Sequence, residues 1–198
     1  IVSKDLIKQT LSRIGYKNKI FHIAEETGFC RISNQDIVLM ADIGTKKNLK
    51  KQNKAGLFSF EFYYKKQKII SNLGDVINSN TINAHNSLAS SAAHSTLSID
   101  DRNNIDLSGN RKTETLNLEI GKAIEGDLID ITHSGYELIF GVHHRRRIYL
   151  SKNKGEIRGQ DDIINCKNIG SIPKKANIRF HLHPEINLIK VRNGSILL

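Results

Sequence analysis

Hydrophobic and polar residues change their pattern once, early in the chain. In the first segment, Ile7, Leu11 and Ile14 recur at the period of one face of an α-helix. Ser3 is placed to cap the start of this helix and Gly15 to end it. The pattern therefore predicts a short amino-terminal helix.

From Tyr16 onward, short apolar or alternating runs are separated by turns rich in Gly, Asn and Lys. Such runs, repeated about every 8 to 14 residues, are typical of strands in an all-β fold. The clearest runs cover residues 37–41, 58–62, 68–70, 95–99, 136–140 and 147–150. We therefore predict an antiparallel β-sandwich over residues 16–198, preceded by a helical linker over residues 1–15.

Three reversals support hairpins, at residues 65–67, at residues 153–155 and at Asn193-Gly194, which is a strong two-residue turn signal. The run that starts at Ser195 stops at Leu198, so we expect the sheet to continue beyond this sequence. The chain also lacks an initiating Met, and we expect it to be an internal piece of a longer protein.

The chain carries 30 Lys and Arg against 20 Asp and Glu, a net charge of +10. This excess fits either attraction to polyanions or a solvated, Lys-rich surface, and charge alone does not decide between them. Nucleic-acid binding is disfavoured because aromatic residues are only 6% and Trp is absent. No apolar run is long enough to span a membrane. Cys30 and Cys166 are far apart in sequence and are expected to be buried free thiols.

Histidine supplies the candidate chemistry. His143 and His144 run into Arg145, Arg146 and Arg147, and strand alternation puts Arg145 and Arg147 on one face and Arg146 on the other.

A second group, His181-Leu182-His183, has a spacing that metal sites use, but no nearby ligand completes it, so packed or hydrogen-bonded histidines are expected. His94 lies among small residues that lead into a predicted strand, and His133-Ser134-Gly135-Tyr136 is a turn. The sequence holds none of the common nucleotide, hydrolase or metalloprotease motifs, so the residues alone leave the chemistry open.

Several segments together resemble the β-sandwich domain of heparinase II/III-like proteins, in particular a poorly characterised bacterial branch of that family. The resemblance extends from about Tyr16 to the end. It rests on the order and spacing of Gly28-Phe29-Cys30-Arg31, residues 54–61, Asn72-Leu73-Gly74, residues 92–97, residues 133–136, residues 144–147 and residues 179–184.

The resemblance implies a supersandwich-like fold that follows an amino-terminal α/α toroid, absent from this sequence. It implies a polysaccharide lyase that cleaves an acidic, uronic-acid-containing glycan by β-elimination. This sandwich would line the cleft, and this segment alone would be inactive. It also implies a bacterial protein of the periplasm or cell envelope.

Characterised lyases of this family have a His-x-His, an Asp and a late His in a fixed order. In those lyases the second His of the His-x-His, the Asp and the late His bind a divalent metal, usually zinc, and the first His helps catalysis. The matching positions here are Gln52, Lys54, Asn72 and His94. A protonated Lys and an amide are poor zinc ligands. We therefore expect no metal or other cofactor, and we hypothesise that the Lys54 ammonium replaces the metal charge.

The residues predicted to line the site are His94, His133, Tyr136 and Arg145. The leading hypothesis is a lyase cleft. The alternative is a non-catalytic carbohydrate-binding or scaffolding module with a degenerate cleft.

Overall fold

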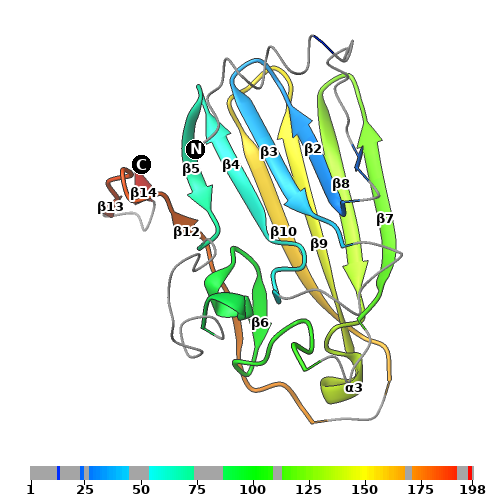
Figure 1. The fold of residues 1–198 in the computed structure, drawn as a ribbon. Coiled ribbons are helices and arrows are strands. Elements are labelled where there is room, and N and C mark those ends of the chain that lie inside the picture. The colour runs from blue at the N-terminus through cyan, green and yellow to red at the C-terminus, as the bar shows by residue number, and fades with distance from the viewer. Residues whose placement is uncertain are drawn as a thin grey trace.

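The computed structural model describes residues 13, 23–24, 27–44, 54–73, 87–108, 113–167, 171–190 and 196–197. Over these residues the chain forms two main antiparallel sheets that pack face to face, with smaller elements at one end (Figure 1). The predicted all-β sandwich is confirmed. The predicted amino-terminal helix lies outside the described residues, except for Arg13, whose backbone is helical.

The first main sheet has the order β1-β2-β3-β4-β5-β12. Its strands are β1 (Ile23–Ala24), β2 (Phe29–Ser33), β3 (Ile37–Asp42), β4 (Phe60–Tyr64), β5 (Gln67–Ser71) and β12 (His181–Leu182). The hairpin predicted at residues 65–67 joins β4 to β5. Lys65 and Lys66 there have positive φ angles of 46° and 70°, the backbone of a two-residue turn whose twist matches its strands.

The second main sheet has the order β10-β9-β8-β7 and longer strands. These are β7 (Thr115–Lys122), β8 (Gly126–His133), β9 (Val142–Ser151) and β10 (Ile157–Asn165). Strand β9 alternates between buried and half-buried residues. Arg146 therefore faces the core while Arg145 and Arg147 face outward, which confirms the alternation predicted for these arginines.

Smaller elements lie at one end of the sandwich (Figure 1). They are the 3-10 turn η2 (Ser91–Ala93), the pair β6 (Leu97–Ile99) and β11 (Ala176–Ile178), and the short helix α3 (Glu137–Phe140). The strands β13 (Ile189–Lys190) and β14 (Ile196–Leu197) also pair. They flank the predicted Asn193-Gly194 turn, which itself lies outside the described residues.

Apolar side chains from the inner faces of both main sheets form the core. Each fully buried Ile or Leu contributes roughly 1.5–3 kcal/mol to folding. Members of the core include Ile32, Leu39, Phe60, Ile129, Ile131 and Ile148. This core fixes the outward direction of the alternate residues on β2, β3 and β4.

Two predictions were wrong in detail. Residues 136–140 were expected to form a strand, but α3 lies there, because Gly141 adopts a left-handed conformation (φ 65°) and ends the helix. Both cysteines are free thiols as predicted, but only Cys30 is buried, and Cys166 is exposed because it follows the end of β10.

Candidate functional site

A hollow of about 370 Å³ lies on the face of the first sheet that is turned away from the core. It draws residues from strands β2, β3 and β4, from the segment before β4, from the two residues after β5 and from the residue after η2. The lining residues are Phe29, Met40, Asp42, Lys54, Gly56, Ser59, Glu61, Asn72, Leu73 and His94. Lys54, Asn72 and His94, which are distant in sequence, thus meet in one cavity.

His94 directly follows η2, and only 5% of its surface is exposed. Its Nδ1 lies 2.8 Å from the carbonyl oxygen of Ser90. Because a carbonyl only accepts, Nδ1 must carry the proton, and the neutral ring then has its lone pair on Nε2. A Cβ at Gly56 would come within 2.6 Å of the imidazole Cδ2, so this ring position requires a glycine at residue 56.

The side chain of Asn72 binds the backbone of a neighbouring segment of the pocket wall. Its Oδ1 accepts a hydrogen bond from the N–H of Ser95 at 2.9 Å, next to His94 in sequence. The hydroxyl of Ser95 in turn donates to the carbonyl of Ser71 at 3.0 Å. The end of β5 and the segment after η2 are therefore tied together, and this connection brings Asn72 and His94 to the same cavity.

Two acidic residues in the pocket were not predicted from the sequence. Burial raises the pKa of Asp42 to about 6, although the N–H of Gly44 donates to its Oδ1 at 2.9 Å and partly offsets that rise. Glu61 accepts from Lys68 Nζ at 2.8 Å and from the Tyr63 hydroxyl at 3.1 Å. The only sequence signal for Asp42 was its place at the end of an alternating strand.

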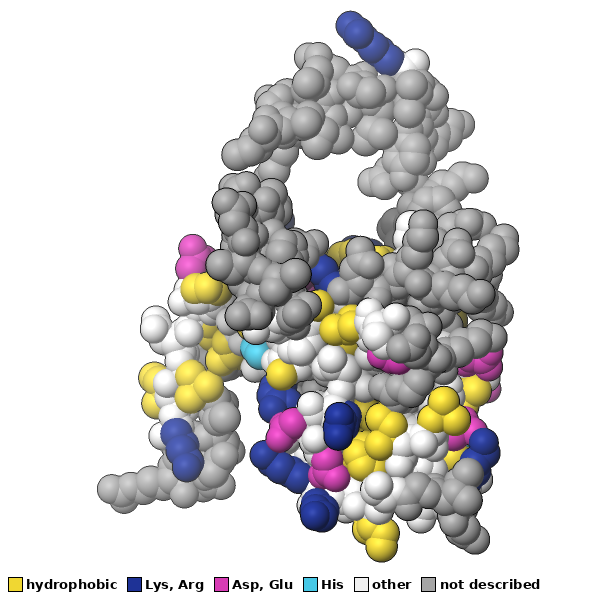
Figure 2. All heavy atoms as spheres, turned by 60° about the horizontal axis from the view of Figure 1, so that its bottom comes forward, with side chains coloured by type: hydrophobic (Ala, Val, Ile, Leu, Met, Phe, Trp, Pro, Cys, Tyr) yellow, Lys and Arg dark blue, Asp and Glu magenta, His cyan; other side chains and the backbone are white. Residues whose placement is uncertain are grey.

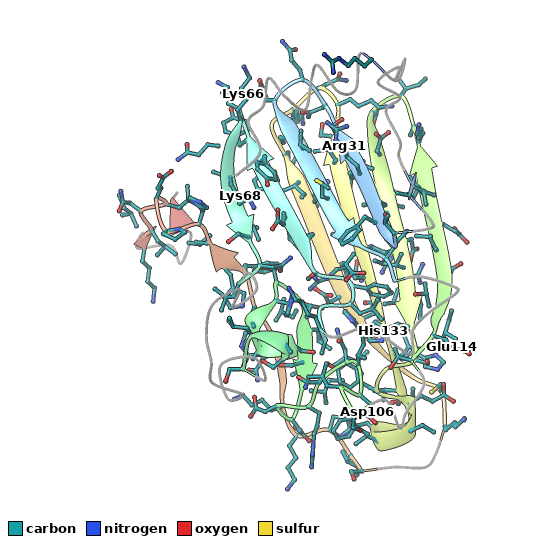
Figure 3. The ribbon with its side chains drawn as sticks, viewed as in Figure 1. Arg31, Lys66, Lys68, Asp106, Glu114 and His133 are labelled. Atoms are coloured by element: carbon teal, nitrogen blue, oxygen red, sulfur yellow. The ribbon has the colours of Figure 1, made fainter. Side chains whose placement is uncertain are left out.

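A second hollow, of about 550 Å³, lies on the same face and shares Met40 with the first. Its lining includes Tyr63 and the turn residues Lys65 and Lys66. Lys66 and Lys68 extend from the β4–β5 hairpin (Figure 3). The outward face of this sheet thus carries two adjacent hollows with basic side chains along one edge.

Arg146 supports the pocket from the core. Its Nη1 donates to the carbonyls of Phe58 and Ser95, each at 2.8 Å. These carbonyls belong to the two segments that carry Gly56 and His94. Its Nε and Nη2 donate to Asp161 at 2.6 and 3.0 Å. Phe58 has a positive φ of 61°, which is unfavourable for a non-glycine residue. This conformation turns the Phe58 carbonyl toward the guanidinium of Arg146.

Two buried histidines continue this network. His133 Nδ1 accepts from the N–H of Gly135 at 3.0 Å, so its proton is on Nε2, which donates to His144 Nδ1 at 3.0 Å. His144 Nε2 then donates to Asp161 at 2.6 Å. Burial lowers the pKa of both histidines, and for His144 it outweighs the hydrogen bond to Asp161, which raises the pKa of that ring. Both rings are therefore neutral, and the chain of donors has one consistent direction.

The other predicted site residues lie away from the pocket. His133 is fully buried near the end of β8 (Figure 3), and Tyr136 is fully buried with its hydroxyl donating to the carbonyl of Leu97 at 2.9 Å. Arg145 lies on the outward face of the second sheet, where its Nε donates to Asp130 at 2.8 Å. The structure brings together Lys54, Asn72 and His94 in the pocket. It places His133, Tyr136 and Arg145 outside it.

The histidines at residues 181 and 183 are hydrogen-bonded, as expected from the sequence. His181 Nε2 lies 2.9 Å from the carbonyl of Ala92, and His183 Nδ1 accepts from the N–H of Glu185 at 3.4 Å. Both rings thus have backbone partners. Neither belongs to a group of three potential metal ligands among the described residues.

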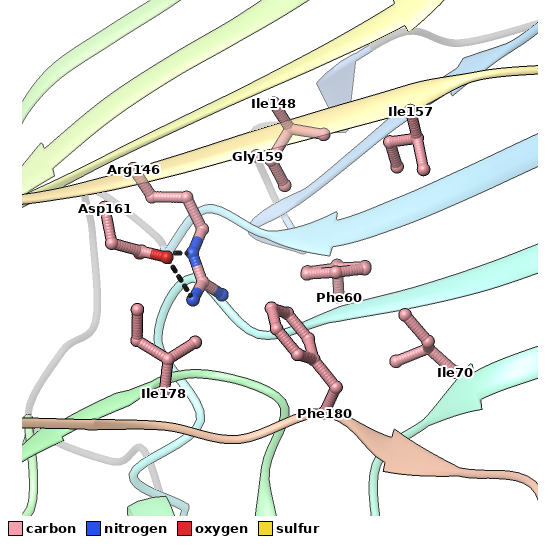
Figure 4. Close-up of a pocket in the computed structure, with 9 residues that line it drawn as sticks. All are labelled: Phe60, Ile70, Arg146, Ile148, Ile157, Gly159, Asp161, Ile178 and Phe180. Carbon is pink, nitrogen blue, oxygen red and sulfur yellow. Dashed lines mark hydrogen bonds and ion pairs between the residues drawn. The ribbon is translucent and has the colours of Figure 1, made fainter. Parts of the chain in front are cut away.

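A third hollow, of about 440 Å³, opens between the sheets (Figure 4). Its walls are mostly apolar, and its polar members are Arg146 and Asp161, which bind each other. It therefore offers little to a polar ligand. The apolar lining consists of Phe60, Ile70, Ile148, Ile157, Gly159, Ile178 and Phe180.

Basic side chains on the surface are frequently paired. Figure 2 shows Lys and Arg lying among Asp and Glu on the face that it presents. Described pairs include Arg147 with Asp162 at 2.8 Å and Lys152 with Asp127 at 3.3 Å. Among the described residues, no helix is long and apolar enough to cross a bilayer.

The sequence profile of the family "Heparinase II/III-like, C-terminal" matches residues 17–198. The chain belongs to this heparinase II/III-like family. Its fold is similar to that of heparan sulfate lyase HepC from Pedobacter heparinus, with a TM-score of 0.66 and 15% identity over 93% of the chain. It is also similar to the heparinase III-BT4657 gene product, with a TM-score of 0.66 and 15% identity over 96% of the chain.

A curated relative is FtsZ-localized protein C from Caulobacter vibrioides, 31% identical over 84 residues, which are 38% of this chain and 14% of the relative. The heparinase II/III-like chain spans only 28% of HepC and 29% of the BT4657 product. The family model that it matches is that of the carboxy-terminal domain.

The zinc ion implied by the family can be tested against the pocket residues. The pocket presents an ammonium at Lys54, an amide at Asn72 and a single imidazole at His94. The ammonium and the amide are poor zinc donors. The carboxylates of Asp42 and Glu61 also line the pocket, but among the described residues they do not form a group of three close ligands with His94. Among the described residues, three close metal-ligating side chains occur only elsewhere, at Glu137, His143 and Cys166. The pocket residues do not fit a zinc ion.

Proposed function

We propose that this domain forms one wall of the cleft of a polysaccharide lyase that cleaves uronic-acid-containing glycans by β-elimination. The observation that carries the proposal is the meeting of Lys54, Asn72 and His94 in one outward hollow. Membership of the heparinase II/III-like family supports the lyase relationship.

The pocket residues suit the first steps of β-elimination. The sugar carboxylate must be neutralised so that the adjacent C5 proton becomes acidic, and the Lys54 ammonium supplies a positive charge for this. A base then removes the proton, the bond from C4 to the glycosidic oxygen breaks as an acid protonates that oxygen, and a C4–C5 double bond forms. His94 Nε2 holds the basic lone pair of the neutral ring and is our candidate base.

Asp42 is our candidate for proton transfer near neutral pH. Its pKa of about 6 lets the carboxyl give or take a proton at that pH, and a shifted pKa in a cavity is a feature of functional carboxyls. The second hollow beside it, with Lys65 and Lys66, favours a polymer that occupies several sites along this face.

The remaining catalytic groups are proposed to come from an amino-terminal toroid domain of the same protein, outside this sequence. The relatives are several times longer than this chain, which supports a further domain. On the family resemblance we also propose an acidic polysaccharide as partner, and the periplasm or cell envelope of a bacterium as the location.

The test is the ultraviolet absorbance of the unsaturated product, measured on the full-length protein with heparan sulfate, alginate and other uronate polymers. Wild type is expected to give a rise, and His94→Ala to slow it by roughly 10²–10⁴-fold, the usual contribution of a general base. His183→Ala is the matched control because His183 lies outside the pocket. No rise with any polymer, or equal rates for the two variants, would contradict the proposal.

A scaffolding role is the second candidate, and the similarity to FtsZ-localized protein C favours it. In this case the pocket is degenerate, and the full-length protein co-sediments with FtsZ filaments without releasing unsaturated sugar. Absence of co-sedimentation together with lyase activity would exclude it.

A further inference from the structure

Three potential metal ligands converge at the corner where α3 meets β9. Glu137 is the first residue of α3, His143 is the second residue of β9, and Cys166 follows the last residue of β10. Their ligand atoms all lie within 4.8 Å of one another. This corner is separate from the pocket that holds His94, because the two sites share no lining residue.

Gly141 fixes the corner through its backbone. Its N–H donates to the carbonyl of Glu137 at 2.8 Å, and its left-handed conformation ends α3. Its carbonyl accepts from the N–H of Cys166 at 2.9 Å, from the N–H of Lys167 at 3.2 Å and from the Cys166 thiol at 3.1 Å. The register of β9 with β10 ends one residue earlier, so Cys166 is held beside the helix.

The spacing requires little adjustment to hold a metal. His143 Nε2 lies 2.9 Å from Glu137 Oε2. Tetrahedral zinc with bonds of about 2.0–2.3 Å separates its ligand atoms by roughly 3.3–3.8 Å. An ion could therefore enter if the two atoms moved apart by about half an ångström, and side chains that are about one-fifth exposed have room to do so.

The donor set is selective. A thiolate with an imidazole and one carboxylate oxygen suits zinc and disfavours magnesium and calcium, which prefer oxygen ligands. One thiolate and one carboxylate neutralise the two charges of the ion. Lys167 pairs with Oε1 of Glu137, so it leaves Oε2 to serve as ligand.

We propose that Glu137, His143 and Cys166 bind one Zn²⁺ ion, with water in the fourth position. The ion clamps α3 and the start of β9 to the segment after β10. On binding, the Cys166 thiol loses its proton to solvent, and His143 must present an unprotonated Nε2 to the ion. This inference does not depend on the proposed lyase activity.

The test is titration of the metal-free full-length protein with Co²⁺, followed by displacement with Zn²⁺. A cysteine thiolate bound to Co²⁺ gives a charge-transfer absorption, so the spectrum reports the ligand type. Cys30 is the other cysteine of this domain and lies buried in the core cluster, so Cys30→Ala is the matched control for Cys166→Ser. Wild type and Cys30→Ala should show the band at one ion per chain, and Cys166→Ser should lack it.

Glu137→Gln should weaken Zn²⁺ binding by more than about 10-fold, since loss of even an outer-shell partner costs that much. Thermal melting of each metal-free variant shows whether it is folded. Because Cys166 is exposed, Cys166→Ser should have the same melting temperature as the wild type. Absence of the band in folded wild type, or a band that survives Cys166→Ser, would overturn the proposal.

Discussion

Asp161→Ala should be among the most destabilising single changes in this domain. The side chain of Asp161 is 7% exposed, and it accepts from two nitrogens of Arg146 and from Nε2 of His144. Its removal leaves a buried guanidinium, itself 2% exposed, without a counter-charge. Breaking a buried ion pair in this way costs about 3–5 kcal/mol. Against a usual total of roughly 5–15 kcal/mol, the loss is a large part of the stability.

The neighbouring residue provides the control. Asp162 pairs with Arg147, but these side chains are 30% and 34% exposed, so Asp162→Ala should cost no more than about 1 kcal/mol. Urea unfolding of both variants, compared with wild type, gives the two free energies. The double variant Arg146→Met, Asp161→Leu should recover only part of the loss. It removes both buried charges, but it leaves the carbonyls of Phe58 and Ser95 without the guanidinium that donates to them. Similar losses for Asp161→Ala and Asp162→Ala would refute the reasoning.

Acid unfolding gives an independent check on the same residue. Burial raises the pKa of Asp161, but hydrogen bonds from His144 and Arg146 outweigh it and lower the pKa from 3.8 to about 2. A lowered folded-state pKa stabilises the protein above pH 3.8, and this gain is lost as the pH falls through 2. The contribution is roughly 2 kcal/mol, and it should be absent from Asp161→Ala. An unchanged acid limb in that variant would contradict this assignment.

Two further predictions concern the pocket. The pKa of Asp42 is raised to about 6, so its charged form destabilises the fold at pH 7. Asp42→Asn should therefore raise the free energy of unfolding by up to about 3 kcal/mol at pH 7, and this gain should vanish as the pH falls to 3.8. Urea unfolding at both pH values measures the effect, and equal effects at the two would refute it. Gly56→Ala should displace the His94 ring and cost roughly 1–3 kcal/mol. Gly159→Ala is its control, because a Cβ there meets nothing within 4 Å; equal melting temperatures would contradict the close packing.

The fold was largely predictable from alternation. Period-2 patterns and turn residues indicate strands and hairpins directly, as at Lys65 and Lys66. The same pattern misled at residues 136–140, where an apolar run formed a helix, because the decisive signal was a single left-handed glycine at 141. Alternation placed Arg146 on the inner face but could not name its partners. Those partners lie 15, 51 and 88 residues away in sequence.

The candidate site was predictable only in part. Family resemblance selected Lys54, Asn72 and His94, and the structure brings them together. Asp42 and Glu61 were missed, because a lone carboxylate on a strand has no sequence signature until the fold shows which cavity it lines. Lys54, Asn72 and His94 come from three different segments, and single-sequence patterns do not report such long-range pairing.

A crystal structure of the full-length protein with a bound uronate oligosaccharide would test the central claim most directly. The account predicts a sugar in the hollow on the outward face of the first sheet, with its carboxylate at the Lys54 ammonium and its C5 hydrogen facing His94 Nε2. A sugar bound elsewhere, with Lys54 and His94 making no contact to it, would contradict the account.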